Sequence, residues 1–209
     1  MYSNIVFDVD GTLIDTEDAS LLSLRDLVLE VLKIDMPLED LLFSQGIPSR
    51  EALDILGIEL SEKTGILWQG YYSKYITNDL LFEGIAETLE QLRIIECPLG
   101  IITSRSNSEY QKDFAPLGLS HYFQYVICAN DTKKHKPDPE PMLKYLELSG
   151  ADPSKVLYIG DTQYDMECAT GAGVDFALAL WGAKNPDSIK AKYHLKHPGE
   201  VLGFCTSQR

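Results

Sequence analysis

Short apolar segments separated by helical segments are the feature that most constrains the fold of this chain. Segments such as KVLYIGD at 155–161 show no alternation of apolar and polar residues, which is typical of a strand buried on both faces. Between them, apolar residues recur every three or four positions, as in amphipathic helices. Because parallel strands need a long crossover, this alternation predicts an α/β fold with a parallel-sheet Rossmann-like core covered by helices. The predicted strands are 4–9, 98–104, 125–129, 155–161 and 174–180, and the core helices are about 84–95, 107–117, 138–148, 162–170 and 198–205.

The stretch between the first two strands carries no strand pattern. Proline and glycine residues divide it, and we predict helices at 16–33, 38–44, 49–56 and 61–77. An all-helical segment between two strands of one sheet indicates an inserted module. We therefore predict a helical cap domain at 16–80 and a catalytic core made of 1–15 and 81–209.

Composition excludes several classes of partner. The 209 residues carry a formal net charge of −14, so most of the surface repels nucleic acid and anionic membranes. An anionic substrate would need a metal ion, a lysine or an arginine at its binding site. The sequence has neither a basic leader followed by an apolar stretch nor a run of 18 apolar residues. We expect a soluble, cytoplasmic monomer that binds a small molecule.

The cysteine pattern indicates no metal site. Cys97, Cys128, Cys168 and Cys205 lie far apart, and no pair has the C-x-x-C spacing. The sequence therefore predicts neither a zinc site nor a disulfide framework, but four reduced and mostly buried thiols.

Polar residues follow the predicted strands at their carboxyl ends. The first strand runs into Asp8 and Asp10, the second into Thr103 and Ser104, the third is followed by KKHKPDPE, and the fourth ends at Gly160-Asp161 and continues to Asp165. Ligands of parallel α/β sheets sit beyond the carboxyl ends of the strands. These segments should therefore converge on one site.

Four motifs in this order, each after its own strand, carry a resemblance to a known family. They are D-x-D-G-T at 8–12, Thr103-Ser104, Lys136 in KPDPE, and G-D-x-x-x-D at 160–165. The chain resembles the haloacid dehalogenase-like hydrolases over essentially its whole length, in the phosphoglycolate-phosphatase-like branch with a helical cap. The resemblance implies a Mg²⁺-dependent phosphatase that forms an aspartyl-phosphate.

The first motif would supply the nucleophile and the proton donor. Residues two apart in an extended chain point to the same side, so Asp8 and Asp10 can face one ligand. Asp8 is the predicted nucleophile, and Asp10 the general acid and then the base. Proximity to Asp8 should raise the second apparent pKa of the pair, which suits an acid. The turn at Gly11 and Thr12 should bring backbone N–H groups toward a phosphate.

Asp161 and Asp165 are the predicted Mg²⁺ ligands, together with Asp8 and the backbone carbonyl of Asp10. Magnesium prefers an octahedron of oxygen ligands and commonly bridges substrate phosphate. In the alternative interpretation, Asp161 caps the following helix and Asp165 is solvated. Asp165 could also support the site without binding the ion.

Thr103 and Lys136 are the remaining predicted catalytic residues. The Thr103 hydroxyl and the Ser104 N–H would donate to phosphoryl oxygens, although a helix cap is an alternative for this segment. Lys136 would pair with Asp8 and the phosphate. Lys133 and Lys134 compete for this role, but Pro137 holds Lys136 extended and favours it.

The predicted cap offers fewer signals. Arg50 in GIPSREAL could grip a phosphate or carboxylate with two hydrogen bonds, or face solvent in a helix that Ser49 caps. Trp181-Gly182, after the last predicted strand, could line the entrance or simply pack. Phosphoglycolate, sugar phosphates, nucleoside monophosphates and pyrophosphate all remain open as substrates.

Three other functions compete with the phosphatase. A phosphosugar mutase of the same fold usually carries Val or a similar residue where this chain has Thr12. A non-catalytic binding protein would be expected to lack one of the acidic residues. A dehalogenase needs neither Asp10 nor the metal pair, so the presence of these residues disfavours it.

Overall fold

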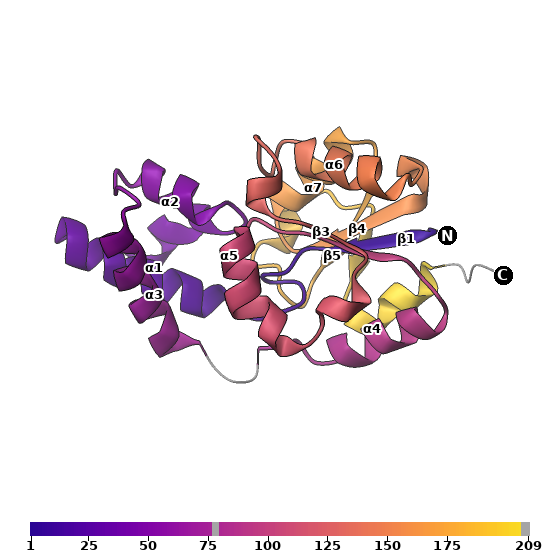
Figure 1. The fold of residues 1–209 in the computed structure, drawn as a ribbon, viewed down its shortest axis with the longest axis horizontal. Coiled ribbons are helices and arrows are strands. Elements are labelled where there is room, and N and C mark those ends of the chain that lie inside the picture. Colours follow the sequence, from indigo (N-terminus) through magenta and orange to yellow (C-terminus); the bar gives the residue numbers. More distant parts are fainter. Residues whose placement is uncertain (77–79, 206–209) are drawn as a thin grey trace.

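A six-stranded parallel sheet forms the centre of the molecule. The structure, a computed structural model, describes residues 1–76 and 80–205. The strands lie in the order β3-β2-β1-β4-β5-β6, and every neighbouring pair is parallel (Figure 1). The predicted α/β Rossmann-like fold is confirmed. The strands are β1 (Asn4–Phe7), β2 (Leu99–Ile102), β3 (Tyr125–Ile127), β4 (Val156–Gly160), β5 (Asp175–Ala179) and β6 (Tyr193–Leu195).

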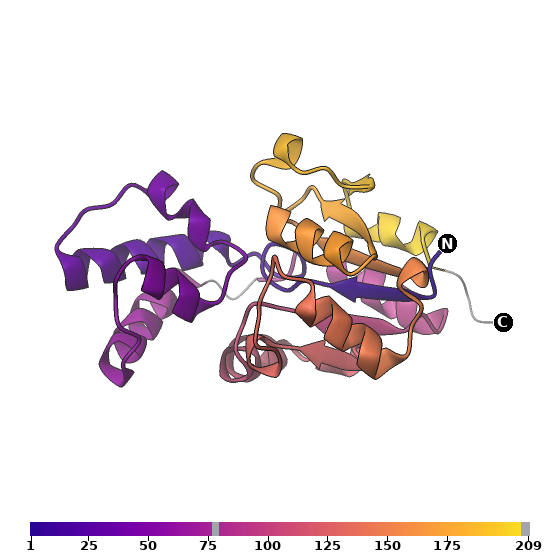
Figure 2. The ribbon, with the colours of Figure 1, turned by 90° about the horizontal axis from the view of Figure 1, so that it is seen from above.

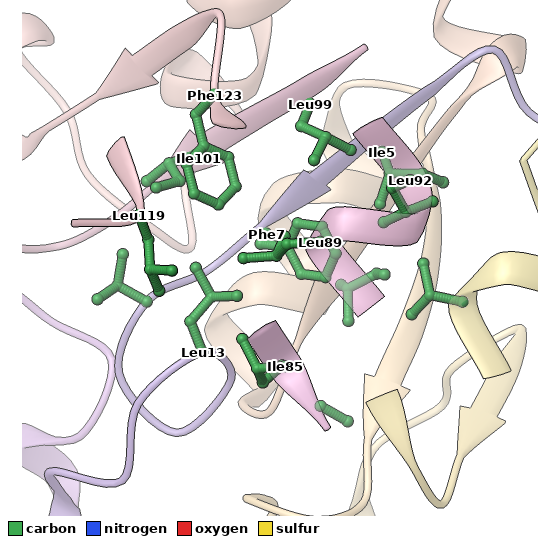
Figure 3. Close-up of a cluster of buried hydrophobic side chains, with 14 of the residues drawn as sticks. Ile5, Phe7, Leu13, Ile85, Leu89, Leu92, Leu99, Ile101, Leu119 and Phe123 are labelled. Atoms are coloured by element: carbon green, nitrogen blue, oxygen red, sulfur yellow. The ribbon is translucent and has the colours of Figure 1, made fainter. Parts of the chain in front are cut away.

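Helices cover both faces of the sheet, which explains why its strands show no apolar–polar alternation. Helices α6 (Glu140–Ser149) and α7 (Gln163–Gly171) lie on one face, and α4 (Ile85–Ile94) with the 3-10 helix η8 (Pro198–Gly203) lies on the other (Figures 1 and 2). Within β1, Val6 joins the apolar cluster under α6 and α7. Its neighbours Ile5 and Phe7 pack with Leu89 and Leu92 of α4 in the other cluster (Figure 3). Both faces of the strand therefore need apolar side chains.

The segment between β1 and α4 folds as a separate helical block with its own small core. It contains α1 (Glu17–Leu32), the 3-10 helix η1 (Leu38–Ser44), α2 (Ser49–Ile55) and α3 (Glu62–Tyr75). These elements bury a cluster that includes Leu24, Leu27, Leu41 and Leu53. The block lies at the opposite end of the molecule from the N-terminus (Figure 2). The four predicted helices are confirmed, except that residue 77 lies outside the described residues.

Two segments connect the block to the sheet, and these two segments pair with each other. Ile14 and Leu81 form an antiparallel bridge, and the N–H of Asp15 donates to the carbonyl of Leu80 at 2.7 Å. The connection is therefore a short two-segment ribbon at the predicted domain boundaries. The division at 15/16 and 80/81 stays a prediction.

The structure corrects several predicted elements. The helix expected at 107–117 is broken into α5 (Asn107–Glu109), a π-helical turn η2 (Tyr110–Phe114) and a 3-10 turn η3 (Ala115–Leu117). Pro116 has no N–H to donate, which prevents one continuous helix. The last predicted helix is the 3-10 helix η8, and the three-residue strand β6 was missed because it is too short to show a pattern. Further 3-10 turns are η4 (Ser120–Tyr122), η5 (Ala129–Asp131), η6 (Pro153–Lys155) and η7 (Pro186–Ser188).

The prediction of four reduced thiols is wrong for one pair. Cys97 and Cys205 form a disulfide across 108 positions of sequence. Cys97 follows α4 and Cys205 follows η8, and these two helices pack together, so only the fold brings the cysteines into reach. Cys128 and Cys168 are free and buried, as predicted. None of the helices in the described ranges is long and apolar enough to cross a membrane.

Candidate active site

The turn after β1 is built around Gly11. This residue has a φ of +74°, and a Cβ there would lie 2.2 Å from Oδ2 of Asp161. A Cβ at Gly182 would lie 1.7 Å from the carbonyl oxygen of Gly11, and the Trp181 indole donates to the carbonyl of Thr12 at 2.9 Å. The Trp181-Gly182 loop therefore holds this turn in place. Of the two interpretations of these residues, this contact agrees with packing rather than with lining the entrance.

Three carboxylates meet below the turn. Carboxylate oxygens of Asp8, Asp161 and Asp165 all lie within 4.8 Å of one another, and all three side chains are buried. Burial, partly opposed by Lys136, raises the pKa of Asp8 to about 7. Burial and the charges of Asp165 and Asp8 raise the pKa of Asp161 well above its usual range. The cluster therefore carries more negative charge than its surroundings compensate.

Lys136 is the cation inside this cluster. Its Nζ lies 3.0 Å from Oδ1 of Asp8 and 2.7 Å from Oδ1 of Asp165, and the side chain is 2% exposed. Burial lowers its pKa, but the charges of Asp165 and Asp8 outweigh burial and raise it. Lys133 and Lys134 are exposed, and of the three lysines it is Lys136 that lies next to Asp8.

The cluster fits a divalent metal ion. One lysine faces three buried carboxylates, and every available donor is an oxygen, the ligand that Mg²⁺ prefers. The two later aspartates are held differently. Oδ1 of Asp165 accepts from Lys136 and Tyr158, and its Oδ2 accepts from the N–H of Thr162, whereas Asp161 accepts only from Thr12 among the described side chains. Asp161 is therefore freer than Asp165 to bind a metal ion. The contacts of Asp165 suit a residue that supports the site without binding the ion.

Asp10 is held by an arginine that the sequence analysis did not select. Arg105 donates from Nε to Oδ2 of Asp10 at 2.8 Å and from Nη2 to Oδ1 at 2.6 Å, and Thr16 also donates to this carboxylate. Burial raises the pKa of Asp10, but Arg105 and Thr16 outweigh burial and lower it. The prediction of a raised pKa is therefore met by Asp8 and is wrong for Asp10. Arg105 directly follows Thr103-Ser104 at the end of β2, so the strand-end rule could have found it.

The side-chain hydroxyls of Thr12, Thr103 and Ser104 all have protein partners in this structure. The Thr12 hydroxyl donates to Asp161 at 3.0 Å, and Oγ1 of the buried Thr103 accepts from the N–H of Arg105 at 3.1 Å. The Ser104 hydroxyl donates to the carbonyl of Gly46, in the helical block, at 2.6 Å. Ser104 thus fastens the block to the end of β2.

A cavity of about 210 Å³ lies between the ends of the strands and the helical block. Asp8, Asp10 and Ser104 line its core side. Arg50 is exposed and is not among the lining residues, so the structure does not bring this predicted substrate-binding residue to the site. Its neighbour Ser49 does line the cavity.

Comparison with known proteins agrees with this geometry. The model of the haloacid dehalogenase-like hydrolases matches residues 5–179. The chain is 28% identical over 202 residues to the pyrophosphatase PpaX of Bacillus velezensis, covering 95% of this chain and 94% of the relative. It is 29% identical over 200 residues to the phosphoglycolate phosphatase of Aquifex aeolicus, with 95% and 94% covered. A crystal structure from Lactobacillus plantarum, assigned as a phosphoglycolate phosphatase, has a TM-score of 0.83 at 30% identity and covers 98% of this chain and 99% of its own.

These matches and the site define a hydrolase with an aspartate-rich centre on a Rossmann-like sheet. The chain belongs to the haloacid dehalogenase-like hydrolases. Within that family it falls in the phosphoglycolate-phosphatase-like branch.

Proposed function

We propose that this protein is a Mg²⁺-dependent phosphatase that hydrolyses a small phosphorylated metabolite through an aspartyl-phosphate intermediate. The proposed substrates are of the phosphoglycolate or sugar phosphate type. One observation carries the proposal. Asp8, a buried carboxylate that lines the cavity, is paired with Lys136 and lies next to two further buried carboxylates.

Asp8 is the proposed nucleophile. Lys136 holds its Oδ1, which leaves Oδ2 as the oxygen that attacks phosphorus. The P–O bond to the leaving group breaks and the phosphoryl group passes to Asp8. Water then hydrolyses the aspartyl-phosphate, so that one difficult displacement becomes two easier ones. Lys136 and donors from the Gly11 turn, Thr103 and Ser104 would neutralise charge on the phosphoryl oxygens.

Asp10 is the proposed proton carrier. In the first step it would protonate the leaving alkoxide, and in the second it would accept a proton from the attacking water. The contacts with Arg105 keep it ionised, which suits the second step. The first step requires a proton on Asp10, so the proposed cycle includes loosening of these contacts.

The residues that would hold Mg²⁺ are Asp8, Asp161 and the backbone carbonyl of Asp10, with Asp165 bound or in support. When bound, the ion would offset the repulsion between the carboxylates and the incoming phosphate. We further propose that residues 16–80 act as a cap over the site. Action as a cytoplasmic monomer is also part of the proposal, although the Cys97–Cys205 disulfide is unusual for a cytoplasmic protein.

A phosphate-release assay over a panel of phosphorylated metabolites, with and without Mg²⁺, tests this function. Wild-type protein should release phosphate only with the metal, and Asp8→Asn should be inert while its circular dichroism and melting temperature show a folded protein. Turnover by Asp8→Asn at the wild-type rate would remove Asp8 as nucleophile. Isomerisation of a sugar phosphate without phosphate release would instead identify a mutase.

A further inference from the structure

The wall that the helical block contributes to the cavity carries no charge. Among the described residues, it is made of serines, glutamines and aromatic, aliphatic and glycine residues, with no lysine, arginine, aspartate or glutamate. Its serine and glutamine side chains are Ser20, Ser23, Ser44, Gln45, Ser49 and Gln69. This wall faces the position of the leaving group, because Asp8 lies at the opposite, core side of the cavity.

The single cation that lines the cavity in the described chain is already paired. Arg105 makes two hydrogen bonds to Asp10, and its Nη1 lies 3.0 Å from Oδ2 of Asp113. Its Nη2 also donates to the Tyr72 hydroxyl at 3.3 Å. Glu109 adds another carboxylate to the lining, so the cavity as a whole has an excess of negative charge. A second anionic group on a substrate would find no free positive partner here, and burying an unpaired charge is costly.

Neutral hydrogen-bonding groups are available instead. The side chains of Ser20, Gln45 and Gln69 line the cavity and make no hydrogen bond to another described residue. Hydroxyl groups can satisfy such donors and acceptors without bringing charge. Trp68 and Tyr72 add aromatic surface to the same wall, against which the C–H groups of a ligand can pack.

The size of the cavity limits the ligand further. Its volume of about 210 Å³ is below the range of about 300–1,000 Å³ that is typical of sites for drug-sized molecules. A single sugar or a polyol has the appropriate scale for this volume.

From the uncharged wall, the paired arginine and the free amides, we infer that the leaving group is a small, uncharged polyhydroxyl compound. The preferred substrates are then monophosphates of sugars or polyols, whose phosphate is their one anionic group. Pyrophosphate and phosphoglycolate, which carry a second anionic group, are disfavoured. This inference rests on the proposed phosphatase function and narrows its substrate class.

Two substrate pairs that differ in one charge provide the test. Glycerol 3-phosphate and 3-phosphoglycerate share a carbon skeleton but differ by a hydroxymethyl in place of a carboxylate, and glucose 6-phosphate and 6-phosphogluconate form a similar pair. Each compound is measured as a substrate with Mg²⁺ and as a competitor of p-nitrophenyl phosphate hydrolysis. The neutral member of each pair should be preferred by about tenfold or more, the factor that corresponds to about 1.4 kcal/mol.

A charge placed in the wall sharpens the test. Gln69→Lys, in the cavity, should raise kcat/KM for 3-phosphoglycerate relative to glycerol 3-phosphate by about tenfold. Ser73→Lys adds the same charge one turn further along α3 at an exposed position, and it should leave the ratio unchanged.

The outcomes separate the inference from the function on which it rests. Hydrolysis of p-nitrophenyl phosphate that depends on Asp8, combined with equal or better use of the carboxylate members, would overturn the inference and keep the phosphatase. Absence of any Asp8-dependent hydrolysis would overturn the phosphatase proposal and the inference with it.

Discussion

The core and the helical block contribute to one cavity in opposite ways. The core side carries buried, tightly paired charges, such as Lys136 between Asp8 and Asp165. The side from the block has uncharged residues, and the side chains of several of them make no hydrogen bond within the described chain. Charge and rigidity suit the chemistry of a phosphoryl group, which is common to all phosphate esters. An uncharged wall suits recognition of the part of the substrate that varies.

Removal of the buried lysine should have the largest effect on the core side. Lys136→Met leaves Asp8 and Asp165 without their cation, and breaking a buried ion pair costs about 3–5 kcal/mol of folding stability. Activity should fall by about 10²–10³-fold or more, because a charge-stabilising donor is lost. Thermal melts and kcat measure the two effects. The matched control Lys134→Met removes an exposed lysine paired with Asp138 and should change neither; an equal loss in both variants would contradict the special role of Lys136.

Loss of the disulfide should weaken the core without touching the cavity. The double variant Cys97→Ser/Cys205→Ser frees a loop of 108 residues, and such bridges typically contribute about 2–4 kcal/mol. The melting temperature should fall, and kcat at room temperature should stay within about twofold, since neither cysteine lines the cavity. Reduction of the wild-type protein should reproduce the fall. An unchanged melting temperature in both experiments would show that the bridge does not form in solution.

Arg105 joins the two regions, because it contacts Asp10 of the core and Tyr72 of the block. An adjacent arginine lowers the pKa of an aspartate by about 1–3 units. In Arg105→Met the pKa of Asp10 should rise, so the limb of the pH–rate profile that Asp10 governs should move to higher pH by a similar amount. The limb should move to higher pH whether Asp10 acts as the acid or as the base. Asp113→Asn keeps Arg105 on Asp10 and should not move that limb upward; an equal upward shift in this control would refute the assignment.

Magnesium should stabilise the core in a pH-dependent way. The folded-state pKa of Asp8 is raised from 3.8 to about 7, so the metal-free protein loses the associated stability as pH rises through about 7. The ion competes with the proton for this carboxylate. The rise in melting temperature on adding Mg²⁺ should therefore be larger at pH about 8 than at pH about 5.5. Each kcal/mol of stability gained from Mg²⁺ binding should raise the melting temperature by about 2–4 °C. Calorimetry of Asp8→Asn should show a smaller pH dependence, which comes from the raised pKa of Asp161.

The smallest effects are expected in the helical block. Ser49 lines the cavity and donates to Glu109 at 2.8 Å, so Ser49→Ala should cost about 0.5–1.5 kcal/mol and raise KM a few-fold. Arg50→Ala, at the next position, removes an exposed side chain and should leave KM within about twofold. A tenfold rise in KM for Arg50→Ala would support the predicted contact between Arg50 and the substrate. It would also show that the block moves on binding.

Most of the core side could be predicted from the sequence because each residue of that site sits at a fixed place relative to a strand. Asp8, Lys136, Asp161 and Asp165 follow buried apolar runs, and parallel strands bring their carboxyl ends to one edge. The residues that were missed or misread depend on contacts between distant segments. Arg105 was not selected because nothing in its local sequence shows that it turns toward Asp10, and Arg50 was selected although its helix directs it to solvent.

The sequence alone determined the parallel sheet, the helical insertion and the acidic cluster, because apolar periodicity and strand-end position are local properties of the chain. Only the tertiary structure decided the direction of the Asp10 pKa, the pairing of Cys97 with Cys205 and the uncharged wall of the cavity. Each of these depends on which side chains meet across many residues of sequence, and Coulomb and hydrogen-bond energies depend on distances that a local pattern does not contain.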